Sequence, residues 1–271
     1  QMRAITTVAA CLAIATIGTS SAVAKSCGND GNGFSPWLTG FEDRARSAGI
    51  SQATLSRALS DVTYDRNVIR RDRSQKSFKL SFDEFYARRV GSSLIGSARA
   101  KMKAHAGVLA RIEKRYGVPK EILVSIWGLE TNFGRDGAGK YSIIRSIATL
   151  AYDCRRSEFF TGHLMAALRI VQKGDMSPGE MRGGWAGEIG QVQFLPGSYD
   201  KYAVDFDGDG RRDLVHSVPD ILASTANFLK GHGWQPGGSW QPGSANYGVI
   251  KDWNRADVYA RTIAVMADRL Q

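Results

Sequence analysis

Apolar residues recur at every third or fourth position along most of the chain, which is the spacing of one buried helix face. Few segments alternate with a period of two, so we expect a mainly α protein (α+β) with one short hairpin. The helices predicted from this pattern cover residues 36–48, 52–59, 97–116, 119–133, 142–151, 158–173, 217–231 and 255–270. We expect Ser51 and Ser217 to be N-caps and Gly117 to end the helix before it. Residues 62–77 are charged and predicted to be extended, and residues 78–90 carry aromatic side chains at mixed spacing.

The first 24 residues have the pattern of a secretory signal peptide. Met2 and Arg3 precede an apolar run through Ile17, and small residues at 22–24 suit a cleavage site. The run is too short for a membrane-spanning helix. We therefore expect export, with cleavage near Ala24 and no integral membrane segment in the mature chain.

Domain organisation follows from where the helical pattern is clearest. We expect a helical segment at 25–96 that packs on the core, and a main domain at 97–271 that contains an Asp-rich loop at 205–216. The composition, 43% hydrophobic and 23% charged over 271 residues, is that of an ordinary globular protein.

Charge and cysteine usage narrow the choice of partners. The formal charge of +10 favours anionic partners, but export and the lack of a basic–aromatic repeat argue against nucleic acid. An anionic extracellular polymer fits better. Loss of the signal peptide would leave Cys27 and Cys154, for which one disulfide and two unrelated thiols both stay open.

The stretch from Gly117 to Gly134 contains the strongest candidate for chemistry. Its apolar residues lie on one helix face, and Glu130 falls on that same face, four residues after Ile126. A carboxyl group desolvated in this way keeps its proton near neutral pH, as a general acid requires. The alternative is a glutamate at a helix end that turns to solvent.

The Asp-rich loop begins like a calcium-binding loop. Aspartates 205, 207 and 209 stand at positions one, three and five, glycine stands at six, and Asp213 stands at nine. His216 occupies position twelve, where a bidentate carboxylate normally completes the shell, so calcium in this loop is doubtful. The alternative is a tight hairpin stabilised by Asp-Gly turns.

A glycine-rich stretch over residues 184–199 offers groups that suit sugar rings and N-acetyl groups. It contains the amides of Gln191 and Gln193 and the aromatic rings of Trp185 and Phe194. The alternative is a structural turn packed by the two aromatic rings. Near the C-terminus, Trp253, Asn254 and Tyr259 are candidates for groove walls or, alternatively, core residues. The four histidines have no metal-ligand spacing, and we predict no metal site among them.

Several of these segments together resemble one enzyme family. Residues 128–134, GLETNFG, resemble the catalytic motif of lytic murein transglycosylases, and residues 185–199 and 202–210 look like the B branch of that family. Residues 224–234 and 253–259 continue the match. The similarity is ordered from about Gly117 to the end of the chain and is weaker before Leu94.

The resemblance implies a lysozyme-like fold, a periplasmic location and a groove for peptidoglycan glycan strands. It implies that Glu130 is the single catalytic carboxylate and protonates the oxygen between N-acetylmuramic acid and N-acetylglucosamine. The acetamido group of the substrate would assist, and Glu130 would then act as a base on the muramyl C6 hydroxyl to give a 1,6-anhydro product. The enzyme would be a carbon–oxygen lyase that requires no cofactor, and we expect a monomer.

The resemblance also marks substrate-binding positions and departures from the family pattern. The matched groove positions are Gln193, Phe228, Trp253, Asn254 and Tyr259. Family members often have tyrosine in place of Phe228 and Trp253, so the hydrogen bonds of those positions are in doubt. Glu188 stands where relatives often have a small residue, and it is either a second acidic group near the site or a solvent-facing substitution, of which we favour the latter. The alternatives are a hydrolytic muramidase, a peptidoglycan-binding relative without turnover, and a calcium-binding module.

Overall fold

The structure is a computed structural model that describes residues 27–75, 80–137 and 139–271. The predicted signal peptide and its cleavage site lie outside these residues. The described residues are mainly helical, as predicted. The helices are α1 (Phe34–Ser47), α2 (Gln52–Leu59), α3 (Arg66–Ser74), α4 (Phe82–Arg89), α5 (Ser92–Ala104), α6 (Ala106–Tyr116), α7 (Lys120–Thr131), α8 (Ile143–Tyr152), α9 (Ser157–Lys173), α10 (Pro196–Tyr202), α11 (Val218–Gly231), α12 (Ala245–Trp253) and α13 (Asp257–Asp268).

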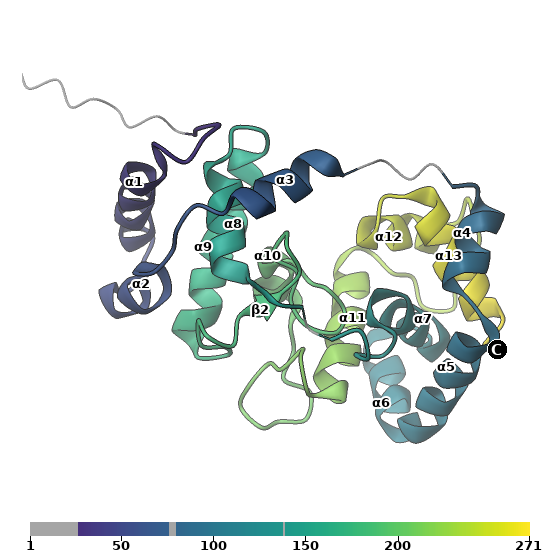
Figure 1. Cartoon of the computed structure of the whole chain (residues 1–271). Helices are drawn as coiled ribbons and strands as arrows, with labels where there is room; N and C mark the ends of the chain where they lie inside the picture. Colours follow the sequence, from purple (N-terminus) through teal and green to yellow (C-terminus); the bar gives the residue numbers. More distant parts are fainter. Residues whose placement is uncertain (1–26, 76–79, 138) are drawn as a thin grey trace, which may run out of the picture.

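The helices form two groups that meet at the centre of the molecule (Figure 1). In one group, α8 packs along α9, and α1, α2 and α3 cover these two helices. In the other group, α7 is surrounded by α5, α11 and α13, with α6 on α11 and α4 on α13. Helix α10 contacts both α9 and α11 and therefore joins the two groups.

Helix α7 lies at the centre of its group because its apolar residues, which fill most of the helix from Ile122 to Leu129, occur on all of its sides. Nine of its twelve residues are buried, including the fully enclosed Trp127. A helix that is apolar on all sides must be covered on all sides. This explains why α7 is enclosed by neighbours that come from both ends of the chain.

The N-terminal segment is held by a disulfide between Cys27 and Cys154, one of the two alternatives left open by the sequence. The backbone of Gly28 donates to Tyr152 and accepts from Cys154 beside this bond. The predicted division of the chain at residues 96 and 97 stays a prediction. That position falls inside α5, and the helices before it attach to both groups.

Several predicted helix ends are confirmed by their capping contacts. Ser51 caps α2 by accepting a hydrogen bond from the Thr54 amide, and Ser217 caps α11 through the Asp220 amide. Gly117 ends α6 in the left-handed conformation at φ 73°. These helix ends could be predicted from the sequence because each depends on residues within one helical turn.

Two local predictions were wrong. Residues 66–74 form helix α3 and are not extended, because Asp65 caps the helix and its buried positions are Val68 and Asp72. An aspartate on the buried face hides the helical period from a search for apolar residues. The helix predicted over 97–116 is interrupted at His105 (φ −112°, ψ 22°), which separates α5 from α6.

The small sheet pairs segments that are far apart in the sequence. Strand β1 (Tyr141–Ser142) runs antiparallel to β2 (Arg182–Gly183). The sheet is thus not a local hairpin, and in the described residues the Asp-rich loop contributes no strand to it. Its effect is to fix the start of the glycine-rich loop beside α8.

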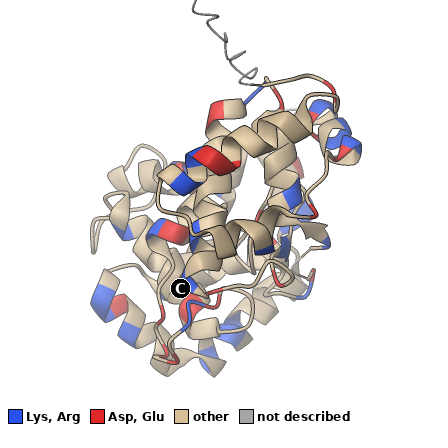
Figure 2. Cartoon of the chain, turned by 90° about the vertical axis from the view of Figure 1, so that its left-hand side faces the viewer, with Lys and Arg blue, Asp and Glu red and all other residues tan. Residues whose placement is uncertain are grey.

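Two surface properties bear on where the protein works. None of the helices in the described residues has the length and apolar character needed to cross a membrane. Lysines and arginines are distributed over many elements and are interspersed with acidic residues (Figure 2). The net positive charge is therefore not concentrated in a single basic stripe of the kind that tracks nucleic acid.

Candidate active site

A cavity of about 520 Å³ lies where the two helix groups meet. Its walls come from the end of α7, the start of α9, the glycine-rich loop, α11 and the end of α12. Six of the predicted site residues line this cavity: Glu130, Gln193, Phe194, Phe228, Trp253 and Asn254. The structure thus brings together side chains that are separated by more than a hundred positions in the sequence.

Glu130 is held at the cavity wall by the way α7 ends. It lies in the last turn of the helix, and Asn132, Phe133 and Gly134 follow in the left-handed conformation (φ 50°, 61° and 81°). Left-handed residues other than glycine are uncommon and strained. The chain therefore turns away immediately after Glu130, and its carboxyl group stays at the end of the helix.

Two hydrogen bonds converge on one oxygen of Glu130. The indole Nε1 of Trp253 and the hydroxyl of Tyr259 each lie 2.8 Å from Oε1. An indole nitrogen can only donate a hydrogen bond, so Oε1 is an acceptor. The proton of the neutral acid then belongs on Oε2, the oxygen without a hydrogen bond from the described residues. The acid is therefore oriented, with one oxygen fixed and the other free to donate.

Burial raises the pKa of Glu130 above the usual value for a glutamate. The hydrogen bonds from Trp253 and Tyr259 oppose this increase because they stabilise the carboxylate. The position of Glu130 at the negative end of α7, whose last turn contains no basic residue, favours the neutral acid as well. The balance is a half-buried carboxyl group that holds a proton at higher pH than a surface glutamate.

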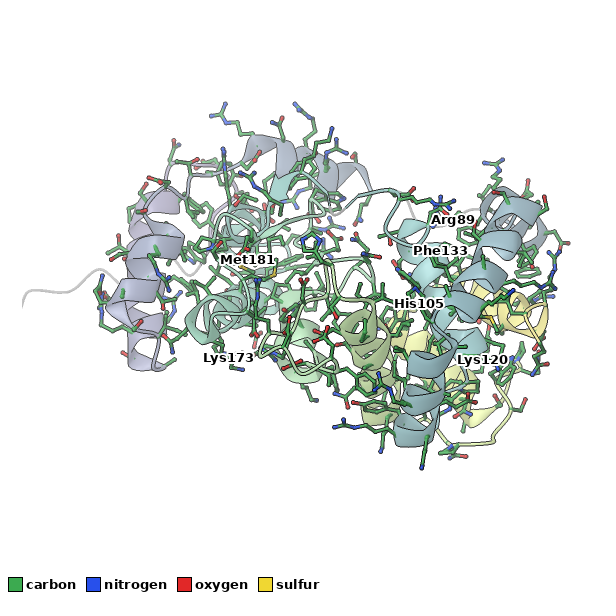
Figure 3. All side chains as sticks on the ribbon, turned by 90° about the horizontal axis from the view of Figure 1, so that it is seen from below. Arg89, His105, Lys120, Phe133, Lys173 and Met181 are labelled. Carbon is green, nitrogen blue, oxygen red and sulfur yellow. A yellow bond between two sulfur atoms is a disulfide. The ribbon has the colours of Figure 1, made fainter. Side chains whose placement is uncertain are left out.

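Arg89 is a charged neighbour of Glu130 that the sequence did not point to. Its guanidinium on α4 donates to the backbone carbonyl of Leu129, and its charge lowers the pKa of Glu130. In Figure 3, the labelled Arg89 and Phe133 both lie at the end of α7. Only the fold shows this role, because α4 precedes α7 by thirty residues and has no motif of its own.

The glycine-rich loop is tied to α7 by Gln191, which the sequence suggested as a sugar-binding amide and not as a structural link. Its side-chain oxygen accepts from the indole of Trp127 (2.8 Å), and its amide donates to the carbonyl of Val215 (2.7 Å). Its backbone carbonyl accepts from the hydroxyl of Thr131 (2.6 Å). One residue thus connects the helix that carries Glu130, the loop that lines the cavity, and the segment after the Asp-rich loop.

Three aromatic rings form one wall of the cavity. The ring of Phe194 lies 5.7 Å from Phe228 and 5.3 Å from Trp253, and Phe228 meets Trp253 edge-on at 5.1 Å. These distances are typical of aromatic pairs in protein cores. Trp253 is only partly buried and offers the exposed surface, whereas Phe194 and Phe228 support it from behind.

The other predicted binding residues have distinct positions. Gln193 has a left-handed backbone (φ 54°) and donates its amide to the carbonyl of Gly190. Asn254 accepts a hydrogen bond from the Ala256 amide, in the short segment that precedes α13. Tyr259 is 6% exposed and reaches Glu130 from the protein interior. Their contacts with substrate stay predictions.

Glu188 also lines this cavity, so its interpretation as a solvent-facing substitution was wrong. It is partly buried, and burial raises the pKa of its carboxyl group. Other side chains of the cavity wall were not predicted as site residues, among them Arg156 and Phe159, which is 51% exposed. Both lie at the start of α9, where the local pattern gave no signal for a binding role.

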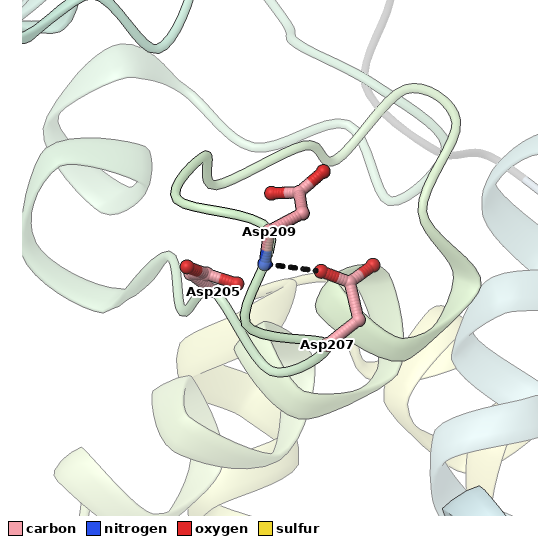
Figure 4. A group of neighbouring side chains, drawn as sticks. All are labelled: Asp205, Asp207 and Asp209. Carbon is pink, nitrogen blue, oxygen red and sulfur yellow. Dashed lines mark hydrogen bonds between the residues drawn. The ribbon is translucent and has the colours of Figure 1, made fainter.

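In the Asp-rich loop, Asp205, Asp207 and Asp209 point oxygens toward one another within 4.8 Å (Figure 4). Asp213 instead accepts hydrogen bonds from the backbone of Val215 and His216. The fully buried Asp220 on α11 accepts from the amides of Phe206 and Asp213, at 2.7 and 2.8 Å. Protein contacts therefore account for much of the shape of this loop.

Comparison with known proteins identifies what the chain is similar to. The family described as "Transglycosylase SLT domain" matches residues 33–245. Membrane-bound lytic murein transglycosylase B of Escherichia coli (strain K12) is 44% identical over 130 residues, which are 48% of this chain and 36% of that protein. The aligned part of this chain thus spans about a third of the length of that relative.

Solved structures agree with this comparison over most of the chain. SltB3 from Pseudomonas aeruginosa, solved in complex with NAG-NAM-pentapeptide and with NAG-anhNAM-pentapeptide, has a TM-score of 0.81 and 32% identity. The match covers 88% of this chain and 79% of SltB3. Slt35 from Escherichia coli, solved in complex with calcium, has a TM-score of 0.76 and 25% identity, covering 90% and 95% of the two chains.

Proposed function

Since the chain belongs to the transglycosylase SLT domain family of lytic murein transglycosylases, we propose that it cleaves the β-1,4 bond between N-acetylmuramic acid and N-acetylglucosamine in peptidoglycan without hydrolysis. The observation that carries the proposal is the placement of Glu130. It is a half-buried acid with a raised pKa, one oxygen fixed by Trp253 and Tyr259, at the wall of a cavity large enough for sugar rings. The complexes of SltB3 with a muropeptide and its anhydro form support the same substrate and product class.

The proposed reaction uses a single carboxyl group twice. Glu130 donates the Oε2 proton to the glycosidic oxygen as the bond from that oxygen to C1 of the muramic acid breaks. The acetamido group of the substrate stabilises the positive charge at C1. The Glu130 carboxylate then removes the proton from the C6 hydroxyl, whose oxygen bonds to C1 and gives the 1,6-anhydro product. Trp253 and Tyr259 stabilise the carboxylate between the two steps by donating to Oε1.

Replacement of the acid tests the proposal. Glu130→Gln removes the proton donor with little change in shape, and we expect turnover of purified peptidoglycan to fall by about 10²- to 10⁴-fold. Glu121→Gln is the matched control, because Glu121 lies at the other end of α7 and pairs with Lys120. A Glu130→Gln variant that still lyses peptidoglycan at the wild-type rate would rule out Glu130 as the acid.

One specific observation favours a second candidate, a hydrolytic muramidase. Glu188 places a second carboxyl group in the cavity, and most glycoside hydrolases use two. Mass spectrometry of the digested product separates the two activities. Anhydromuropeptides support the transglycosylase, whereas reducing ends with an added water support the muramidase. A folded protein that binds glycan strands and releases neither product would be a binding protein.

We propose further that the protein acts in the periplasm as a monomer and that catalysis needs no cofactor.

Calcium in the Asp-rich loop stays a separate proposal. The three converging aspartates and the calcium complex of Slt35 support it, whereas His216 at position twelve opposes it. Thermal unfolding and activity, measured with calcium and with EDTA, test both points. Loss of activity in EDTA that is restored by calcium would overturn the absence of a cofactor requirement.

A further inference from the structure

Glu188 and Asp252 are the acidic residues of the cavity lining that the proposed reaction does not use, and Glu188 is partly buried whereas Asp252 is exposed. Glu188 lies in the loop between β2 and α10, where its Oε2 accepts a hydrogen bond from the Ala186 amide at 3.0 Å. Its backbone carbonyl accepts from the Gly184 amide, also at 3.0 Å. A Cβ atom at Gly184 would lie 2.0 Å from Oε2, so the carboxyl group folds back over a position that only glycine leaves open. Glu188 is therefore held in the cavity wall and does not extend freely into solvent.

The surroundings of Glu188 leave its charge without a direct counter-ion. Its carboxylate forms no ion pair within the part of the chain that the structure describes, and its hydrogen bonds come from backbone amides. Charges that share a half-buried cavity are screened less by water and salt than charges on the surface. A negative charge on Glu188 therefore acts on the other charged and titratable groups of the cavity, which are Glu130, Arg156 and the exposed Asp252. Of the two other acids, Glu130 is the buried one, and the charge of Glu188 raises its pKa.

The groups that face Glu130 act in opposite directions. Tyr259 from α13 and Trp253 from α12 donate hydrogen bonds to it, and Arg89 from α4 adds a positive charge. All three favour the carboxylate. Glu188 is the charged neighbour that favours the protonated acid, together with burial and the end of α7. Without the charge of Glu188, Glu130 would lose its proton at lower pH.

We propose that Glu188 is a positioning residue that keeps the proton on Glu130 and so extends activity toward alkaline pH. The inference rests on the proposed function, in which Glu130 is the general acid. It concerns the charge of Glu188 and requires no contact with the substrate. It also explains how a site with two donors and an arginine around its acid retains that acid in the reactive form.

The pH dependence of turnover tests this role. We expect Glu188→Gln, which keeps the size of the side chain and an acceptor for the Ala186 amide, to move the alkaline half-maximum of kcat to lower pH. The ratio of wild-type to variant rates should be close to one at acidic pH, rise as the pH passes through the pKa of Glu130, and become constant at higher pH. Glu158→Gln is the control. It removes an exposed carboxylate in the first turn of α9, the end of that helix that borders the cavity, and should leave the pH profile unchanged.

Other outcomes would contradict the inference. A constant loss of rate at every pH would indicate a structural or substrate-contacting role, and an unchanged profile would indicate no role. Circular dichroism and thermal unfolding show whether Glu188→Gln is folded, and Glu188→Ala provides a second variant that lacks the charge. Failure of the proposed function is distinct, since it requires Glu130→Gln to remain active. An inactive Glu130→Gln with an unmoved Glu188→Gln profile overturns this inference alone.

Discussion

The indole nitrogen of Trp253 lies 2.8 Å from Oε1 of Glu130, across 123 residues of intervening sequence. Trp253 is the last residue of α12, and Glu130 lies in the last turn of α7. Two helix ends thus meet at the reactive group, and each supplies one side chain. The same indole ring packs against Phe194 and Phe228, so its donor group is held in place by the aromatic wall.

The variant Trp253→Phe should separate the effect of the indole hydrogen bond to Glu130 from the effect of the aromatic ring. The variant keeps an aromatic side chain in the wall but removes a hydrogen bond to a charged group, which is worth about 1.5–3 kcal/mol. The carboxylate of Glu130 becomes less stable, so we expect the alkaline limb of the pH–rate profile to move to higher pH. Trp240→Phe is the control, because Trp240 donates to Asp268 instead. A shift to lower pH would contradict this account of the donor.

Gln191→Ala should weaken the connection between α7 and the glycine-rich loop. The truncation leaves the Trp127 indole and the Val215 carbonyl without their partner, and each unsatisfied buried group costs about 1–3 kcal/mol. We expect a lower free energy of unfolding in urea. We also expect a loss of transition-state stabilisation, calculated from kcat/KM, that is larger than this loss of unfolding free energy. Gln172→Ala removes two comparable hydrogen bonds at an exposed site and should cost less. Equal losses in the two variants would argue against a special role for Gln191.

The ionic cluster around Asp72 predicts a specific response to acid. Asp72 is 1% exposed, and although burial alone would raise its pKa, hydrogen bonds from Arg155 and Arg156 hold that pKa below its usual value. An aspartate with a lowered pKa stabilises the fold at pH values above its unfolded pKa of about 3.9 and loses that contribution as the pH falls through the folded pKa. The difference in stability between wild type and Asp72→Asn should therefore be largest near neutral pH and shrink below about pH 4. Urea unfolding across this range measures it, with the exposed Asp43→Asn as control.

The disulfide should contribute measurable stability because it closes a loop of 127 residues. Loss of a native disulfide typically costs about 2–5 kcal/mol. We expect the double variant Cys27→Ser, Cys154→Ser to unfold at lower urea concentration than the oxidised protein. Reduced wild type should match the variant, and a reducing agent should leave the variant unaffected. Equal stability of oxidised and reduced wild type would contradict the expectation.

Sequence reasoning succeeded where the relevant partners are close in the chain or share a motif. The cap at Ser51, the stop at Gly117 and the placement of Glu130 on a buried helix face depend on residues within one or two helical turns. The segments around Gln193 and Trp253 were recognised through their motifs, and the structure places both at the cavity. Short-range physics and an ordered set of motifs were sufficient for these features.

Features that depend on tertiary neighbours could not be predicted from the sequence. Helix α3 was missed because Asp72 occupies its buried face, and the arginines that compensate this charge lie eighty residues later. Gln191 appears as one polar residue in a loop, and its importance follows from Trp127 and Val215, which the fold brings to it. Glu188 was assigned to solvent because nothing in its local sequence shows that the loop folds back over Gly184.

The left-handed turn at Asn132, Phe133 and Gly134 has a consequence for redesign of the enzyme. A Cβ atom at Gly134 would collide with the side chain of Gln191, so the turn that follows Glu130 tolerates little variation in sequence. Phe159 also lines the cavity, but its side chain is 51% exposed and carries no such constraint. Libraries aimed at new polysaccharides should therefore vary Phe159 and leave the turn at residues 132–134 unchanged.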